Sequence, residues 1–169
     1  MKNISVVIFA GLVILIGGFF YLKSINKLQE TPTQKPEGTS SSQIIPGYQG
    51  KVLAGKSAPF LEFKKEDYQK ALSENKIIIL DFYANWCPIC RAEAPIIHSG
   101  FDGLTTEKVI GFRVNYNDSD TDADEKALAK QFNITYQHTK VILKNGQQFS
   151  KSLDSWTRED FVNAINQAL

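Results

Sequence analysis

The feature that most constrains the fold is a short apolar run that leads directly into a pair of cysteines. Residues 77–83 read IIILDFY, which is typical of a central strand covered on both faces. The segment CPICRAEAPIIHSG (87–100) follows, and Pro88 stands where a helix can begin, since a proline blocks no hydrogen bond in the first turn. The sequence therefore predicts a buried strand that places Cys87 at the start of a helix, and Gly100 as the end of that helix.

Three further segments carry the periodicity of regular secondary structure. Apolar residues recur at helical spacing in residues 64–74 and 122–132, so both segments predict amphipathic helices. Residues 109–115 form a second short apolar run, which predicts a second buried strand. Strands that alternate with helices in this way are typical of parallel strands joined by right-handed crossovers.

The carboxy-terminal part changes to an antiparallel pattern. Residues 141–143 and 148–150 flank Asn145-Gly146, and that dipeptide predicts a hairpin because both central residues of such a turn need positive φ. A capping-box pattern at residues 157–160 predicts the start of a terminal helix. The predicted fold class is therefore α/β, with a mixed central sheet flanked by helices on both sides.

Residues 1–28 predict a membrane anchor. Ile4–Leu22 is an uncharged run of 19 residues, and as a helix it would span roughly 28 Å, close to the hydrocarbon thickness of a bilayer. It is longer than the core of a signal peptide, and no small-x-small cleavage pattern follows it, so a cleaved signal is the lesser alternative. We expect a single uncleaved transmembrane helix. Flanking lysines give no charge preference, but a short tail before a long globular part favours an extracytoplasmic position for that part.

A tether separates the anchor from the globular domain. Residues 29–50 are rich in Pro, Ser, Thr, Gly and Gln and have few bulky apolar residues, so they predict a flexible linker. The predicted domain then covers residues 51–169. The formal net charge of +1 gives no indication of a nucleic-acid partner.

Cys87 and Cys90 are the only two cysteines in the chain. They are too few for a disulfide framework or a four-cysteine zinc site, and a purely structural disulfide between them would close too small a loop to stabilise the fold much. At a helix amino-terminus, free N–H groups and the helix dipole stabilise the thiolate form of Cys87. We expect Cys87 to be the exposed nucleophile, and Cys90 to lie deeper and resolve the mixed disulfide. Their redox-active disulfide would need no cofactor.

Asp81 is a carboxylate within the apolar strand. Burial disfavours its charged form and raises its pKa. We predict that Asp81, six residues before Cys87, is a catalytic group that moves a proton for Cys90. The alternative is an aspartate at a strand edge or bonded to the backbone.

The segment DFYANWCPICRAEAP (81–95) resembles the active-site segment of thioredoxins and their relatives. The family's buried acid, tryptophan, two cysteines and helix-kinking proline correspond to Asp81, Trp86, Cys87, Cys90 and Pro95. The similarity continues through KNG (144–146), and residues 112–135 particularly resemble the carboxy-terminal domain of bacterial membrane disulfide reductases of the Dsb type. This resemblance implies a thioredoxin fold and thiol–disulfide exchange with protein substrates, with a redox partner that recycles the pair.

The sequence departs from this family at His138. Thioredoxins carry a cis-proline that faces the cysteine pair, and counting back from residues 144–146 places His138 at that position. A non-proline cis bond costs roughly 2.5–4 kcal/mol, so we expect a trans peptide here. The residues predicted to surround the cysteines are Trp86, Pro88, Ile89, His138 and Thr139.

Three interpretations of His138 are open at this stage. It is a loop residue with no chemical role, a protonated imidazole that makes the cysteine pair more oxidising, or a neutral imidazole that binds a metal. In the last case Cys87, Cys90 and His138 would hold copper, zinc or an iron–sulfur centre, although three ligands are few for a closed structural site. The main prediction is therefore an anchored oxidoreductase. The alternatives are a metal-binding or metallochaperone protein of the same fold and an inactive docking domain.

Overall fold

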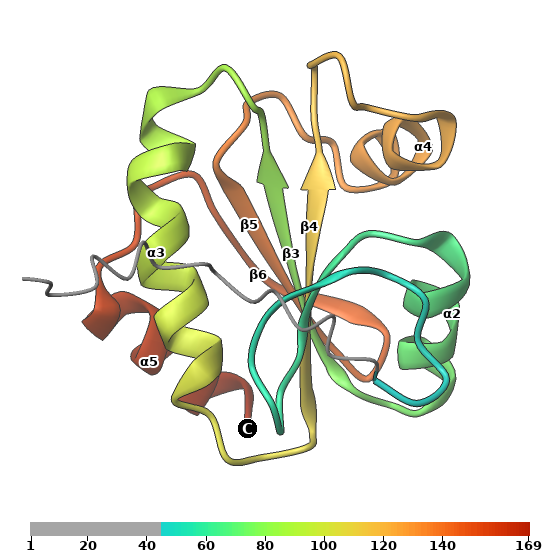
Figure 1. Cartoon of the computed structure of the whole chain (residues 1–169), viewed down its shortest axis with the longest axis vertical. Helices are drawn as coiled ribbons and strands as arrows, with labels where there is room; N and C mark the ends of the chain where they lie inside the picture. Colours follow the sequence, from blue (N-terminus) through green and yellow to red (C-terminus); the bar gives the residue numbers. More distant parts are fainter. Residues whose placement is uncertain (1–44) are drawn as a thin grey trace, which may run out of the picture. The chain divides into compact units, whose positions relative to one another are not determined.

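The computed structural model of the chain describes residues 45–169 (Figure 1). Strands and helices follow one another in the order β1 (Val52–Ala54), β2 (Phe60–Glu62), α2 (Lys65–Ser73), β3 (Ile77–Tyr83), α3 (Pro88–Asp102), β4 (Val109–Asn115), α4 (Ala123–Gln131), β5 (Thr139–Lys144), β6 (Gln147–Ser152) and α5 (Arg158–Ala168).

A six-stranded mixed sheet forms the centre of the described part, with the strand order β1-β2-β4-β3-β5-β6. Strands β2, β4 and β3 are parallel, whereas β1 and the β5–β6 hairpin pair antiparallel with their neighbours. Helices α3 and α5 cover one face, and α2 and α4 cover the other (Figure 1). The predicted mixed sheet with helices on both sides is confirmed. Strands β1 and β2 were not predicted.

Strand β3 separates two apolar cores, because its successive side chains point to opposite faces of the sheet. Ile78, Leu80 and Phe82 belong to the core beneath α2 and α4. Ile77 and Ile79 belong to the core beneath α3 and α5. By the same alternation Asp81 points to the α3 side, which places its carboxyl on the same side of the sheet as the helix that carries the cysteines.

Helix α3 continues beyond its predicted end at Gly100, and that prediction is wrong. The helix runs to Asp102, and Gly103 is its C-cap. Gly100 is instead a packing position, since a Cβ there would lie 2.7 Å from the ring of Phe161 on α5. Glycine therefore allows two helices to approach closely rather than ending one of them.

The predicted turn and capping motifs are confirmed. Asn145 and Gly146 have φ of 55° and 72°, as the hairpin between β5 and β6 requires. The Thr157 side chain accepts a hydrogen bond from the backbone of Asp160, and the Asp160 side chain bonds back, so the capping box opens α5.

The predicted anchor and most of the predicted linker lie outside the described residues. Within residues 45–169, no helix has the length and apolar character needed to cross a membrane. Residues 45–50, which we assigned to the linker, lie against the domain. Tyr48 packs on the core, and the backbone N–H groups of Gln49 and Gly50 donate to the buried carboxylate of Asp67.

Candidate active site

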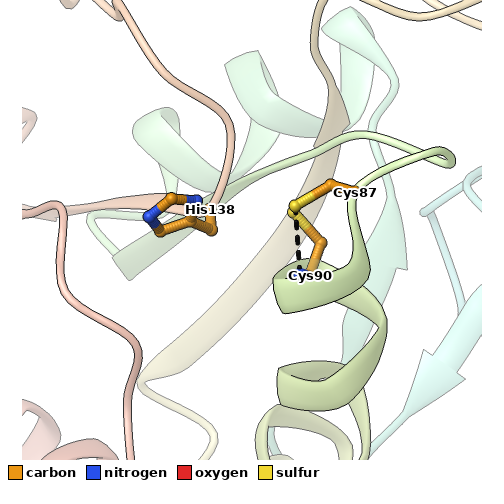
Figure 2. Close-up of side chains that lie close together, drawn as sticks. All are labelled: Cys87, Cys90 and His138. Atoms are coloured by element: carbon orange, nitrogen blue, oxygen red, sulfur yellow. Dashed lines mark hydrogen bonds between the residues drawn. The ribbon is translucent and has the colours of Figure 1, made fainter.

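Cys87 is the N-cap of α3, as the sequence predicted. The turn after β3 is closed by a 3.0 Å hydrogen bond from the Cys87 N–H to the carbonyl of Ala84. The Cys87 sulfur accepts a hydrogen bond from the Cys90 N–H at 3.2 Å (Figure 2). A helix amino-terminus therefore points one of its free N–H donors at this sulfur.

Both cysteines are buried. Cys87 is 1% exposed and Cys90 is 3% exposed, so the expectation that Cys87 is the exposed member of the pair is wrong. The reason is local packing, because the two sulfur-bearing residues form a small cluster with Ala84 and Tyr83. Only a small part of Cys87 is therefore accessible to an incoming disulfide.

The Cys90 thiol is held in its protonated form. Burial is the largest cause and raises the pKa of Cys90 to about 12, and the hydrogen bond with Cys87 and the charges of Cys87 and Asp81 act in the same direction. A backbone hydrogen bond with Ala84 opposes the shift. Cys90 consequently needs a base before it can act as a nucleophile at neutral pH.

Asp81 lies in the middle of the sheet rather than at a strand edge. Its register neighbours are Arg113 on β4 and Lys140 on β5. Desolvation raises the pKa of Asp81 to about 7, Glu93 adds to the rise, and the positive charges of Lys140 and Arg113 oppose it. A carboxyl with this pKa can both accept and release a proton at neutral pH, which is what the predicted role requires.

A buried ion pair, which was not predicted from the sequence, lies beside this carboxyl. Lys140 is 0% exposed and its ammonium group bonds to Glu93 on α3. The same ammonium donates to the carbonyl oxygens of His138 at 2.9 Å and Asp154 at 2.8 Å. All three donors of the lysine are therefore satisfied inside the protein.

Glu93 completes the cluster. Besides Lys140, its carboxylate accepts a hydrogen bond from the backbone N–H of Trp156, which links α3 to the segment before α5. Two sequence signals point to this cluster in retrospect. Glu93 lies three residues after Cys90, hence on the same face of the helix, and Lys140 directly precedes the apolar run VIL.

His138 lies near the cysteine pair, in the loop before β5 (Figure 2). The expected trans peptide is confirmed, since residues 45–169 contain no cis bond. His138 has φ of 54°, and every other residue with positive φ in the described part is asparagine or glycine. Its N–H donates to the carbonyl of Phe82 at 2.6 Å, so the backbone, not the side chain, ties this loop to β3.

The imidazole of His138 lies within reach of both sulfurs. One ligand atom from each of Cys87, Cys90 and His138 lies within 4.8 Å of the other two. Among the described residues, Nδ1 of His138 is buried without a hydrogen-bond partner. The structure therefore brings together the three residues of the predicted metal alternative.

Exposed apolar side chains lie close in sequence to the cysteines and to His138. Trp86, Ile89 and Tyr136 are exposed large hydrophobic side chains, and the Trp86 indole is fixed by a 3.0 Å hydrogen bond to the carbonyl of Asn117. Thr139 is buried, and its hydroxyl donates to the carbonyl of Tyr136 at 2.7 Å. Pro88 is exposed in the first turn of α3.

A family model and the related proteins agree on one family for this chain. The family model described as Thioredoxin matches residues 59–167. Thioredoxin H4 from Arabidopsis thaliana is 35% identical over 97 residues, which are 57% of this chain and 74% of that protein. Thioredoxin from Haemophilus influenzae is 29% identical over 111 residues, covering 63% of this chain and 94% of that protein.

A solved structure shares the same fold. It is a chain of the complex of ferredoxin:thioredoxin reductase and thioredoxin f2, which superimposes with a TM-score of 0.52 at 25% identity. The match covers 64% of this chain and 94% of that chain. The fold likeness therefore extends over nearly the whole of the compared chain.

Proposed function

Because this chain belongs to the thioredoxin family and is a thiol–disulfide oxidoreductase, we propose that it exchanges disulfides with proteins from a membrane-anchored position outside the cytoplasm. One observation carries the proposed chemistry. The Cys87 sulfur lies at the amino-terminus of α3 and accepts the Cys90 N–H, while a carboxyl with a pKa of about 7 lies on the same side of the sheet.

The reaction runs in two exchanges. Cys87 attacks a substrate disulfide, forms a bond to one sulfur and releases the other as a thiolate. Asp81 then accepts the Cys90 proton, and Cys90 attacks the Cys87 sulfur and frees the substrate's second thiol. The substrate gains two electrons and Cys87–Cys90 is left as a disulfide. A reductant must then recycle the pair, as reductases do for thioredoxins.

The first exchange makes the Cys90 proton easier for Asp81 to accept. In the free protein the hydrogen bond and charge of Cys87 both help to raise the pKa of Cys90. In the mixed disulfide the Cys87 sulfur is neutral, so these two causes disappear and the Cys90 proton becomes easier to remove. The resolving thiol is therefore activated when it is needed.

Proteins rather than small thiols fit the surroundings of the cysteines. Trp86 and Ile89 flank the cysteines in the chain, Tyr136 lies two residues before His138, and all three are exposed; large apolar and aromatic side chains of this kind are enriched at protein-binding surfaces. A polypeptide can cover these side chains while it presents its disulfide to Cys87.

The proposed compartment depends on the amino-terminal sequence. The uncharged run Ile4–Leu22 supports a single-pass anchor, and residues 29–44 support a tether for the domain. The resemblance of residues 112–135 to Dsb-type membrane reductases points to the same location.

Two measurements test this function. With an insulin-type disulfide substrate and a reductant, Cys87→Ser is expected to lose exchange, whereas Cys90→Ser is expected to accumulate a covalent mixed disulfide through Cys87. Undiminished turnover in Cys87→Ser would overturn the assignment. Protease treatment of intact spheroplasts tests the location: residues 51–169 should be digested, and protection of the domain contradicts an extracytoplasmic position.

A further inference from the structure

We propose that the reduced protein binds one thiophilic metal ion, of the Zn²⁺ or Cu⁺ class, through Cys87, Cys90 and His138. Two thiolates and an imidazole are the donor set that such ions prefer. This binding goes beyond disulfide exchange and does not depend on it.

The distances fit a shared ion. Metal–sulfur bonds to zinc are about 2.3 Å and metal–nitrogen bonds about 2.0–2.1 Å, so tetrahedral ligand atoms lie roughly 3.5–3.8 Å apart. The three candidate atoms lie within 4.8 Å of one another. A contraction of roughly 1.0–1.3 Å at most, within the reach of side-chain rotation, therefore brings all three onto one ion.

His138 keeps its position although its backbone conformation is unfavourable. A left-handed conformation costs a residue with a Cβ roughly 1–2 kcal/mol, and His138 adopts φ of 54° where the other such non-glycine positions are asparagines. Its N–H is held by Phe82 and its carbonyl by the ammonium of Lys140. Both backbone polar groups are therefore fixed, and the ring is held beside the sulfurs before any ligand arrives.

One ring nitrogen of His138 is also available to bind a ligand. Within the described part of the chain, Nδ1 of His138 is buried and makes no hydrogen bond. A buried nitrogen without a partner is unfavourable, and coordination of a metal would satisfy it. The Cys–Cys–His set leaves one position open, as in catalytic zinc sites with three protein ligands and a water.

The charges around Cys87, Cys90 and His138 are compatible with a bound cation. Two thiolates neutralise a divalent ion, and the buried positive charge of Lys140 is already paired with Glu93. Binding forms two S–metal bonds and releases to water whatever protons the two thiols still carry, so no oxidant or reductant is consumed. A Cys87–Cys90 disulfide leaves no thiolate to bind, so metal binding and the oxidised state exclude each other.

The test is a competition titration of the full chain. Reduced protein is titrated anaerobically with Zn²⁺, and separately with Cu⁺, against a chromogenic chelator. We expect one ion per chain for at least one metal and none for the oxidised protein. Absence of binding for both metals overturns the proposal.

The key variant is His138→Asn. Among residues 45–169, asparagine occupies the other non-glycine positions with positive φ, so this change keeps the backbone conformation and removes the imidazole. Affinity should fall at least ~100-fold, since losing even an outer partner of a ligand costs roughly 10–100-fold. Equal affinity in His138→Asn and the parent would overturn the site, because the two thiols alone would then bind the ion.

The chain offers a matched control, because it contains only two histidines. His98→Ala removes the other imidazole, which lies against the ring of Phe60, and it should leave metal affinity unchanged. An equal loss in His98→Ala would overturn the assignment to His138. Failure of the metal site leaves disulfide exchange by Cys87 intact, so the two proposals fail separately.

Discussion

Lys140→Met tests whether the buried ion pair holds the active site together. The substitution keeps most of the side-chain volume but removes an ammonium that bonds to Glu93 and to the carbonyl oxygens of His138 and Asp154. It leaves the Glu93 carboxylate buried without its cation. Removing one partner of a buried pair costs roughly 3–5 kcal/mol, so we expect a loss of that size in the free energy of unfolding.

A double-mutant cycle separates the ion pair from simple packing. Glu93→Gln removes the charge and keeps an acceptor for the Trp156 N–H. Because neither charge is left unpaired in the double variant, it should be more stable than the sum of the single losses predicts, with a coupling energy of about 2–3 kcal/mol. The measurement is urea unfolding of the reduced chain at neutral pH, analysed by linear extrapolation.

Two results would refute this reasoning. One is a loss below about 1 kcal/mol in Lys140→Met, which is the range of an exposed pair. The other is strict additivity in the cycle. Lys65→Met is the matched control, since its partner Asp124 lies on the surface and both side chains are about half exposed; this variant should change stability far less than Lys140→Met.

Two further predictions concern the core and the central carboxyl. Gly111→Ala places a Cβ 2.2 Å from the Phe101 ring and 2.6 Å from the Phe60 ring, so urea unfolding should show a loss of about 1–3 kcal/mol or more. In the control Gly103→Ala the one close contact of the new Cβ is the flexible end of Arg158 at 2.7 Å, while two backbone carbonyl oxygens lie at an ordinary contact distance of 3.5 Å; an equal loss there contradicts the packing argument. Asp81 has a folded pKa raised to about 7 from 3.8, so its burial destabilises the fold increasingly as pH rises from 4 to 7. Asp81→Asn should therefore gain on the order of 4 kcal/mol of stability at pH 8 and less than about 1 kcal/mol at pH 4. A gain that does not change with pH in unfolding experiments would contradict this assignment.

Local patterns were sufficient to predict the elements that carry the cysteines. Strands β3 and β4 match their predicted ranges, because continuous apolar runs mark buried strands. The hairpin and the cap of α5 follow from turn and capping chemistry that acts within four residues. Strands β1 and β2 could not be found in this way, since three residues each are too few to show a period.

The chemistry around Cys90 depends on contacts that no local pattern contains. Lys140 and Glu93 are 47 residues apart, and a lysine beside a hairpin strand normally predicts a solvated side chain. The burial of Cys87 was missed for a similar reason. The position of Cys87 at the start of the helix indicates where its sulfur lies, but the packing of Tyr83 and Ala84 determines how much of Cys87 is exposed.

The departure at His138 belongs to a connected set of residues rather than to a single site. A proline there could not donate the hydrogen bond that His138 makes to Phe82, and its ring would fix φ near −65° instead of 54°. The His138 carbonyl in turn accepts from Lys140, whose burial requires Glu93. The backbone of His138 therefore links the positive φ, the contact with β3 and the buried ion pair, and a change from histidine to proline would break the contact with β3.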